Sequence, residues 1–224
     1  MKYIITGASS GLGFCIAKRL IIHGQVLGIS RTTGKSNLLL ESGMFKYIRY
    51  DLSKTSNKKS YAILIKQILE FIEDEPFTLI LNAANFYYGN KRLSHLKLNT
   101  LFQVNVFSIM NIIRDMKEYD LRRVFIINSV SGLAGQKNQH EYSASKHAVL
   151  GYSRSLAKSA KHDNFDVISI NPGGMKTELW EDIDKVNTLD FLSPEIVADI
   201  CMNLILIKGR IFIDTMSLLP PSDV

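Results

Sequence analysis

Short runs rich in valine, isoleucine and leucine recur along the whole chain, separated by polar segments and by glycine. They predict strands over Lys2–Thr6, Gln25–Ser30, Lys46–Tyr50, Phe77–Asn82, Arg122–Asn128, Phe165–Asn171 and Gly209–Asp214. Between the strands, apolar residues at helical spacing predict helices over Leu12–His23, Lys59–Glu73, Thr100–Glu118, Tyr142–Ala160 and Pro194–Ile207. This alternation, with nearly continuous apolar strands, predicts an α/β fold whose parallel sheet is covered by helices on both faces.

The expected architecture is a doubly wound, mostly parallel sheet of seven strands, which is the Rossmann type. At 224 residues the chain fits a single domain over residues 1–224, because chains divide into several domains only beyond roughly 250 to 300 residues. Ligands of such sheets bind beyond the carboxyl ends of the strands. Residues that carry chemistry should therefore follow strands, and the loops after the fourth, fifth and sixth strands should form a substrate pocket.

Composition narrows the class of protein. The chain is 46% hydrophobic and 21% charged, and no apolar run approaches the roughly 18 residues that span a bilayer. The N-terminal apolar run meets Gly7 too early for a signal peptide, so we expect a cytoplasmic protein with no membrane partner. Cys15 and Cys201 are too few for a disulfide framework and are expected to be reduced.

Charge and histidine content argue against two further kinds of partner. The net charge is +6, but the basic residues are spread along the chain and mixed with acids, so nucleic acid is not an expected partner. Solvated faces and an anionic cofactor explain the excess more simply. The histidines lack the spacing of metal ligands, so no metal is expected; they are His23, His95, His140, His147 and His162.

A tyrosine and a lysine four residues apart suggest catalysis. Tyr142 and Lys146 would lie on the same face of a helix. A free tyrosine has a pKa of about 10, and lowering it to roughly 7 takes about 4 kcal/mol, which a neighbouring ammonium and a bound cationic ring can supply. Ser129, directly after a predicted strand, adds a hydroxyl that could hold a carbonyl oxygen while Tyr142 transfers its proton. The spacing alone also arises by chance, so the other motifs decide its meaning.

A glycine-rich segment directly follows the first predicted strand. Residues Thr6–Gly13 read Thr-Gly-Ala-Ser-Ser-Gly-Leu-Gly and open the first predicted helix. Glycines let the backbone approach a pyrophosphate closely, and a helix N-terminus offers unpaired N–H groups and a favourable dipole. A tight strand-to-helix turn without a ligand is the alternative, but the position after the first strand favours dinucleotide binding.

These motifs together resemble the short-chain dehydrogenase/reductase family in its compact single-domain form. The likeness runs from the first strand to at least Thr177 and keeps the order of the family's motifs. It implies the catalytic residues Asn105, Ser129, Tyr142 and Lys146. In the family, the asparagine holds a water that connects to the lysine; without that context, Asn105 would be read as a polar residue on a helix surface. Ser131 is the alternative to Ser129, whose spacing to Tyr142 fits the family better.

The resemblance also implies which residues contact the cofactor. They are Gly7, Ser9, Ser10, Gly11, Leu12, Gly13, Ser30, Arg31, Asp51, Leu52, Asn82, Ala83, Ala84, Tyr142, Lys146, Pro172, Gly173 and Thr177. Pro172 and Gly173 belong to a segment that packs against the nicotinamide in the family, and Thr177 would bond the carboxamide or a phosphate. Asp51 matches the acid that contacts the adenine ring, and an acid at a helix N-terminus is its plain alternative.

The end of the second predicted strand bears on the choice of cofactor. An acid there would bond the ribose 2′-hydroxyl of NAD, whereas an arginine can pair with the 2′-phosphate of NADP. Ser30 and Arg31 therefore favour NADP(H). NAD(H) is the alternative, because Arg31 can instead stack on adenine and the glycine loop lacks the basic residue of many NADP-preferring relatives.

Two features concern the cleft itself. The family's Asn-Asn-Ala-Gly segment is Asn82-Ala83-Ala84-Asn85 here, and Asn85 would suit a left-handed backbone or narrow the cofactor cleft. Phe86–Tyr88 and Trp180 suggest an apolar substrate surface, while Lys137 and His140 could face a polar or anionic group or be solvated. The segment 176–192 looks short for a lid, which predicts an open pocket.

The expected function is reversible hydride transfer between NADP(H) and a small-molecule carbonyl or secondary alcohol. A sugar-nucleotide epimerase or dehydratase is one alternative, but such enzymes usually need a larger C-terminal substrate region. A non-catalytic NADP-binding regulator or scaffold of the same fold is the other, and it would have little reason to keep four catalytic positions. The resemblance further implies a homodimer or homotetramer, assembled through the helices that begin near Thr100 and Tyr142.

Overall fold

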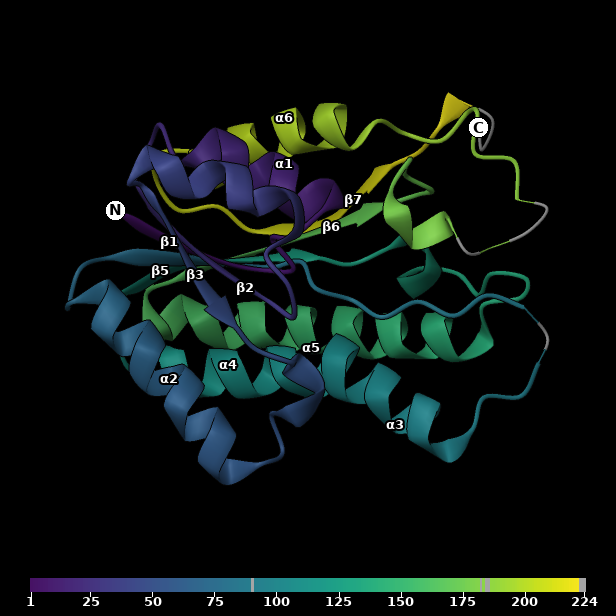
Figure 1. The fold of residues 1–224 in the computed structure, drawn as a ribbon, viewed down its shortest axis with the longest axis horizontal. Helices are drawn as coiled ribbons and strands as arrows, with labels where there is room; N and C mark the ends of the chain where they lie inside the picture. The colour runs from purple at the N-terminus through teal and green to yellow at the C-terminus, as the bar shows by residue number, and fades with distance from the viewer. Residues whose placement is uncertain (90, 182, 184–185, 222–224) are drawn as a thin grey trace.

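The computed structural model describes residues 1–89, 91–181, 183 and 186–221. In this part of the chain, seven strands form one sheet in the order β3-β2-β1-β4-β5-β6-β7 (Figure 1). The strands are β1 (Lys2–Thr6), β2 (Gln25–Ser30), β3 (Phe45–Arg49), β4 (Phe77–Leu81), β5 (Leu121–Ile127), β6 (Asp166–Pro172) and β7 (Ile213–Leu218). All neighbouring pairs are parallel, so the predicted seven-stranded parallel sheet is confirmed.

Helices cover both faces of the sheet, as predicted. Figure 1 shows α1 and α6 on one face and α2, α4 and α5 on the other, with α3 leading into α4. The helices are α1 (Gly11–Leu20), α2 (Lys58–Ile72), α3 (His95–Phe102), α4 (Ser108–Met116), α5 (His140–Asp163) and α6 (Pro194–Ile205). Short 3-10 segments follow four of the strands: η1 (Gly34–Ser42), η2 (Leu52–Lys54), η4 (Val130–Gly132) and η5 (Glu178–Trp180).

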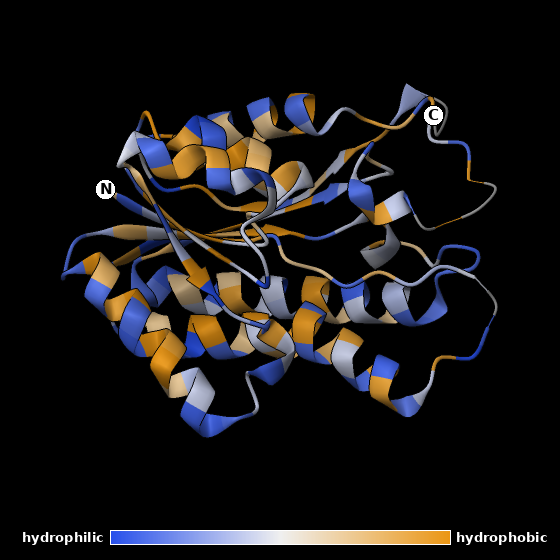
Figure 2. Cartoon of the chain, in the orientation of Figure 1, coloured by the Kyte–Doolittle hydropathy of each residue, from blue (hydrophilic) through white to orange (hydrophobic). Residues whose placement is uncertain are grey.

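Each face of the sheet carries its own hydrophobic core. Every residue of β1 and β4 is buried, and alternate residues serve opposite cores. Ile4 packs in the core under α2, α4 and α5, whereas Ile5 packs in the core under α1 and α6. In Figure 2 the hydropathy colouring shows apolar residues along the strands, and apolar residues alternating with polar ones on the helices that cover them. Burial on both faces explains why these strands appear in the sequence as apolar runs rather than as an alternating pattern.

The last strand differs from its predicted position, beginning at Ile213 instead of Gly209. The cause is Arg123 of β5, whose buried guanidinium fixes the chain that precedes the strand. It donates to main-chain carbonyls at the end of α6 and beyond it, those of Leu204, Ile205, Ile207 and Gly209. These residues are therefore held in a turn and a bend after α6, and strand pairing starts only with Ile213, opposite Ile168 of β6.

Replacing Arg123 with methionine should lower the free energy of unfolding by about 3 to 5 kcal/mol. Arg123 also donates to Asp166 at 2.9 Å, and each of the two residues is 7% exposed. The substitution therefore removes a main partner of a buried carboxylate along with the bonds to the carbonyls. Urea denaturation measures the loss. Arg122→Met is the control. Arg122 forms a solvent-exposed ion pair with Asp120, and such pairs contribute about 0 to 1 kcal/mol to the free energy of unfolding. Equal losses in the two variants would refute this role of Arg123.

One predicted helix is interrupted. The stretch expected at Thr100–Glu118 runs over His95–Met116 as α3, a π-helical turn at Gln103–Phe107 and α4. Such turns insert an extra residue into a helix and occur often at functional sites. The insertion places Asn105 in the turn, completely buried, instead of on a regular helix surface.

The sheet topology fixes where a ligand would bind. The strand order reverses at β1, which pairs with β2 on one side and β4 on the other. In open α/β sheets the crevice outside the carboxyl ends of the strands at such a reversal is the ligand site. No helix in the described ranges is long and apolar enough to cross a membrane.

Candidate active site

The loop between β1 and α1 is tightly packed against the segment that follows β4. A β-carbon on Gly13 would lie 2.1 Å from the carbonyl oxygen of Gly7 and 2.5 Å from Nδ2 of Asn82, so no side chain fits there. The Asn82 amide donates to the carbonyls of Thr6 and Gly7, each at 3.1 Å. Ser10 caps α1 in an extended conformation without a side-chain hydrogen bond. The first N–H groups of the helix are thus oriented for an acceptor from outside the helix.

Thr6 opens the glycine-rich segment and supports the site, although it is not among the predicted cofactor contacts. Its hydroxyl oxygen accepts hydrogen bonds from the backbone N–H groups of Asn82 and Ala83, each at 3.1 Å. The side chain is buried between β1 and β4. Thr6 therefore fixes the segment with the predicted cofactor residues Asn82, Ala83 and Ala84 beside the glycine loop. Its position as the last residue of β1, directly before Gly7, is the only signal in the sequence.

Tyr142, Lys146 and Ser129 meet at the carboxyl end of β5. The first two lie on one face of α5, with Nζ of Lys146 5.7 Å from the centre of the Tyr142 ring. Ser129 lies beside the Tyr142 side chain, and both line one cavity. Nζ of Lys146 donates to the carbonyl of Ile127, the last residue of β5, at 3.1 Å. All three side chains are buried, and none is more than 8% exposed.

Ser129, not Ser131, faces the tyrosine. The Ser129 hydroxyl oxygen accepts from the backbone N–H of Ser131 at 3.1 Å, which fixes the turn after β5. The Ser131 hydroxyl is engaged elsewhere, since it donates to the side chain of Gln139 at 2.9 Å. The turn therefore orients the Ser129 hydroxyl, and Ser131 supports the loop.

Burial dominates the electrostatics of the tyrosine and lysine. It raises the pKa of Tyr142 to about 12, and the neighbouring Ser129 hydroxyl opposes this only in part. It also lowers the pKa of Lys146 to about 8. In the protein without a cofactor, Tyr142 is therefore a neutral phenol at physiological pH. In this arrangement the lysine alone does not bring the pKa of the tyrosine near 7.

The buried Lys146 should make stability depend on pH. Burial lowers its pKa from 10.5 to about 8, so the folded protein loses this proton at a lower pH than the unfolded chain. Stability from this residue therefore rises between those two values as the folded protein sheds a buried charge, by about 3 kcal/mol. Relative to Lys146→Met, which cannot titrate, the wild type should gain most of this amount between about pH 7 and about pH 10. Urea denaturation at both pH values measures the difference, and a constant difference would disprove the assignment.

Asn105 holds the segment after β4 against α5. Its Oδ1 accepts from the backbone N–H of Asn85 at 2.7 Å, and its Nδ2 donates to the Asn85 carbonyl at 2.9 Å. Nδ2 also donates to Oγ of Ser145, at 3.1 Å. Because Asn105 engages its main-chain groups, Asn85 does not adopt the left-handed backbone considered from the sequence. Ser145, between Tyr142 and Lys146 along α5, is a further residue that the motifs do not mark.

Aromatic side chains line the cavity beside Tyr142. Phe86 meets the Tyr142 ring edge-on, with ring centres 4.8 Å apart. Trp180 lies 4.8 Å from Phe86 and 5.0 Å from Phe191. The cavity has a volume of about 170 Å³, and its polar side chains among the described residues are uncharged: Asn128, Ser129, Ser131, Gln136, Gln139, Tyr142, Thr177 and Trp180.

The lining of this cavity includes some of the residues predicted to face the substrate or the nicotinamide, and it leaves others out. Lys137 and His140 are exposed and do not belong to its lining. Pro172, Gly173 and Thr177 do belong to it, which brings the Pro-Gly segment to the catalytic tyrosine. Within the segment 176–192, Asp182, Asp184 and Lys185 lie outside the described residues.

The predicted adenosine contacts lie after β2 and after β3, and the structure gives mixed evidence for them. Arg31 is exposed directly after Ser30, where the sequence predicts a contact with the ribose phosphate. Asp51 caps the short helix η2, and its Oδ1 accepts from the backbone N–H and the hydroxyl of Ser53 at 3.0 and 2.8 Å. Leu52 is buried. The helix-cap interpretation of Asp51 is thus realised, whereas a contact with adenine stays a prediction.

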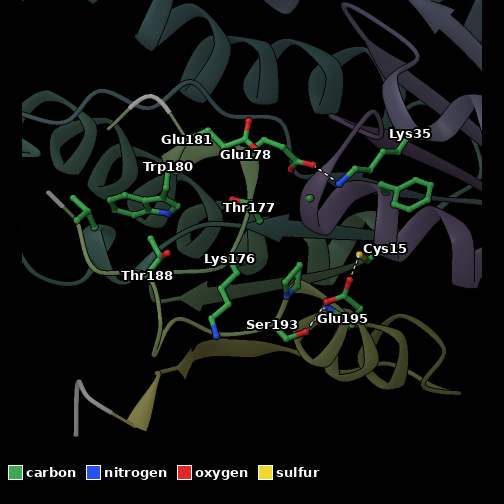
Figure 3. Close-up of a pocket in the computed structure, with 14 residues that line it drawn as sticks. Cys15, Lys35, Lys176, Thr177, Glu178, Trp180, Glu181, Thr188, Ser193 and Glu195 are labelled. Carbon is green, nitrogen blue, oxygen red and sulfur yellow. Dashed lines mark hydrogen bonds and ion pairs between the residues drawn. The ribbon is translucent and has the colours of Figure 1, made fainter. Parts of the chain in front are cut away.

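A charged pair lies at the glycine loop and is not marked by the motifs. Nζ of Lys35 donates to Glu178 at 2.5 Å, as Figure 3 shows. The backbone N–H of Lys35 donates to the carbonyl of Ser9 at 2.8 Å, so the segment after β2 lies on the glycine loop. The Glu178 carboxylate lies beside Gly11, whose backbone N–H helps to hold the pKa of that carboxyl below its usual value. Thr177 is also close, with Cγ2 3.1 Å from where a β-carbon on Gly11 would lie.

These contacts test whether a dinucleotide fits the site. The start of α1 holds a carboxylate here, and a carboxylate carries the charge and the acceptor oxygens that the phosphates of a dinucleotide would bring. Gly13 keeps the loop tight, and the residues expected at the nicotinamide end line one cavity with Tyr142. The residues present therefore fit an anionic dinucleotide laid from the end of β2 across the glycine loop to Tyr142.

Two predictions about cysteine and metal chemistry concern the rest of the chain. Cys15 and Cys201 are buried and unpaired with each other, as expected of reduced structural thiols. Among the residues that the structure describes, no three histidine, cysteine or acidic side chains are grouped as metal ligands.

A doubly wound parallel sheet, a glycine loop opening its first helix and a buried serine, tyrosine and lysine together define an NAD(P)-dependent oxidoreductase. Residues 2–187 match the family model described as short chain dehydrogenase. The chain is 30% identical, over 195 residues, to the 3-oxoacyl-acyl-carrier-protein reductase FabG of Chlamydia muridarum, covering 79% of this chain and 74% of that protein. The chain belongs to the short-chain dehydrogenase/reductase family, whose members of this kind act on CH–OH groups, and the predicted family and enzyme class are confirmed.

Solved structures agree with the fold. A 4-hydroxyisoleucine dehydrogenase mutant, complexed with NADH and succinate, superposes with a TM-score of 0.83 at 23% identity, covering 98% of this chain and 97% of that one. ElxO with NADP bound gives a TM-score of 0.77 at 18% identity, with coverage of 98% and 97%. At these identities the likeness establishes the architecture. One of these neighbours holds NADH and the other NADP, so they do not decide the choice of cofactor for this chain.

Proposed function

We propose that the protein is an NADP(H)-dependent reductase that interconverts a carbonyl compound and a secondary alcohol, with Tyr142 as the acid and base. The observation that carries the proposal is the burial of Tyr142, Ser129 and Lys146 together at the carboxyl edge of the sheet. The turn with Ser129 follows β5 and the glycine loop follows β1, and β4 lies between these two strands in the sheet. A dinucleotide on that loop and a carbonyl at the tyrosine would then meet in one cavity.

Each side chain has a distinct role in this mechanism. The bound nicotinamide supplies the hydride in reduction and accepts it in oxidation. The Ser129 hydroxyl donates a hydrogen bond to the carbonyl oxygen and orients it. Tyr142, a neutral phenol here, gives its proton to that oxygen as the alcohol forms and takes it back in the reverse direction. Lys146 stabilises the phenolate and holds the ribose hydroxyls, and Asn105 positions the loop after β4 and a relay water.

The end of β2 supports NADP(H) as the preferred cofactor. Ser30 and Arg31 stand where an acid would bond the ribose 2′-hydroxyl of NAD(H). An arginine there can form charge-assisted hydrogen bonds with a 2′-phosphate. NAD(H) is the alternative, and comparison of the two cofactors belongs in the first experiment.

The cavity supports a neutral substrate with an apolar group. Its aromatic wall of Phe86, Trp180 and Phe191 offers contact to a ring or a branched chain, and its polar side chains are uncharged among the described residues. A volume of about 170 Å³ suits a compact group next to the carbonyl. The relative's action on 3-oxoacyl groups makes β-keto esters a second class to include.

Titration with NADPH and NADH, followed by a carbonyl panel, tests this proposal. Trp180 is the single tryptophan of the chain and lines the cavity, so its emission reports cofactor binding directly. We expect tighter binding of NADPH than of NADH, and NADPH oxidation with neutral aryl ketones or β-keto esters. Failure of every carbonyl to be reduced, by protein that binds NADPH, would favour the non-catalytic alternative.

A further inference from the structure

We propose that Glu178 is a built-in competitor of the cofactor's phosphates, and that Lys35 is a further phosphate-binding residue that Glu178 engages until the dinucleotide binds. The inference rests on the proposed binding of a dinucleotide at the glycine loop. In this inference Glu178 sets the affinity for the cofactor. Lys35 supplies the basic side chain that the glycine loop itself lacks.

Glu178 occupies the position of an anion at the start of α1. Its carboxylate lies beside the backbone of Gly11, whose N–H helps to lower the pKa of Glu178 and is one of the groups that a helix N-terminus offers to phosphate. The carboxylate oxygen Oε2 lies 3.7 Å from where a β-carbon on Gly11 would stand. A phosphate at the same N–H groups would meet this negative charge at close range, so cofactor binding requires the Glu178 side chain to leave.

The carboxylate is charged at neutral pH. Partial burial acts to raise its pKa, but the Lys35 ammonium and the backbone N–H groups of Glu178 and Gly11 lower that pKa overall. The side chain is 31% exposed and belongs to the short segment η5, so a change of rotamer can carry it into solvent. The competing anion is therefore both charged and removable.

Lys35 is placed by the backbone to contact a phosphate at the loop. Gly34 takes a left-handed backbone with φ of 51°, and a β-carbon there would lie 2.5 Å from the carbonyl of Ser9. This close approach docks Lys35 on the glycine loop, where its own backbone N–H bonds to Ser9. The side chain is 61% exposed and reaches the carboxylate at the N-terminus of α1. An ammonium that reaches this anion also reaches a phosphate that replaces it.

Lys35 also follows β2 closely, four residues after Arg31. It thus stands between the two places where the cofactor presents phosphate, the pyrophosphate at α1 and a 2′-phosphate near the end of β2. The pyrophosphate and the 2′-phosphate each present charged oxygens, with which the Lys35 ammonium can form charge-assisted hydrogen bonds. Comparing NADPH with NADH distinguishes them.

Equilibrium titration without substrate tests the inference. NADPH, NADH and ADP-ribose are titrated into the wild type, Glu178→Gln and Lys35→Met, with calorimetry and Trp180 emission as readouts. We expect Glu178→Gln to bind all three ligands about tenfold more tightly, and Lys35→Met to bind NADPH about tenfold more weakly. A loss confined to NADPH assigns Lys35 to the 2′-phosphate, and an equal loss for NADH and ADP-ribose assigns it to the pyrophosphate.

Glu181→Gln is the matched control, because it removes the same charge from the same segment without a contact to Gly11. Its affinities should stay at the wild-type values. Unchanged affinities in both Glu178→Gln and Lys35→Met, in protein that binds NADPH, would overturn this inference and leave the proposed function standing. If none of the three ligands bound to the wild type or to any variant, both this inference and the proposed function would be wrong.

Discussion

Replacing Tyr142 with phenylalanine should lower carbonyl reduction by about 10²- to 10⁴-fold while leaving NADPH affinity within about threefold of the wild type. The phenol is buried beside Ser129, and its pKa of about 12 in the cofactor-free protein keeps its proton available for donation. Phenylalanine keeps the edge-on contact with Phe86 and removes only the hydroxyl. Steady-state kinetics and Trp180 emission measure the two quantities.

Tyr152→Phe is the control for this substitution. Tyr152 lies on the same helix, α5, and is packed against the core on the α2, α4 and α5 side, away from the cavity. It should retain turnover within about threefold of the wild type, because it donates no proton to substrate. Turnover by Tyr142→Phe comparable to that of Tyr152→Phe would show that another group transfers the proton.

Replacing Gly13 with alanine should abolish measurable dinucleotide binding and lower the free energy of unfolding by about 3 kcal/mol or more. The new methyl group would stand 2.1 Å from the Gly7 carbonyl and 2.5 Å from the Asn82 amide. Relief requires the loop to open or α1 to shift, and either change breaks the Asn82 bonds that shape the loop. Calorimetric titration with NADPH and urea denaturation measure both losses.

Gly151→Ala supplies the control for the glycine loop. A β-carbon on Gly151, in the middle of α5, would meet no heavy atom within 4 Å. Alanine there should raise stability by about 0.5 to 1 kcal/mol, because glycine is a poor helix former. If Gly13→Ala behaved like Gly151→Ala, the close packing of the loop would not be a requirement for binding.

Much of the fold could be predicted because its signals are local. Each parallel strand is buried on both faces and so appears as an apolar run, and the first six predicted strands lie within a few residues of their observed positions. The glycine loop and the tyrosine and lysine spacing are likewise local patterns. Long-range contacts limited the prediction of the last strand. Arg123 binds carbonyls more than eighty residues away, and β7 therefore begins later than the sequence predicts.

The candidate site shows the same division. Sequence spacing suggested that Lys146 would lower the pKa of Tyr142, but the balance depends on burial, which only the packed structure reveals. Lys35 and Glu178 are 143 residues apart, and no motif connects them. Their pairing follows from the docking of Gly34 on Ser9 and from the path of the chain after Thr177, neither of which leaves a periodic signal.

Transfer of deuterium from NADPH labelled at nicotinamide C4 tests the proposed chemistry most directly. The wild type is incubated with the labelled cofactor and the panel of aryl ketones and β-keto esters, and the products are examined by mass spectrometry. We predict an alcohol that carries deuterium on its carbinol carbon, formed by the wild type and by Tyr152→Phe, and formed far more slowly by Tyr142→Phe. NADPH that binds but yields no labelled alcohol from any carbonyl would contradict hydride transfer at this site.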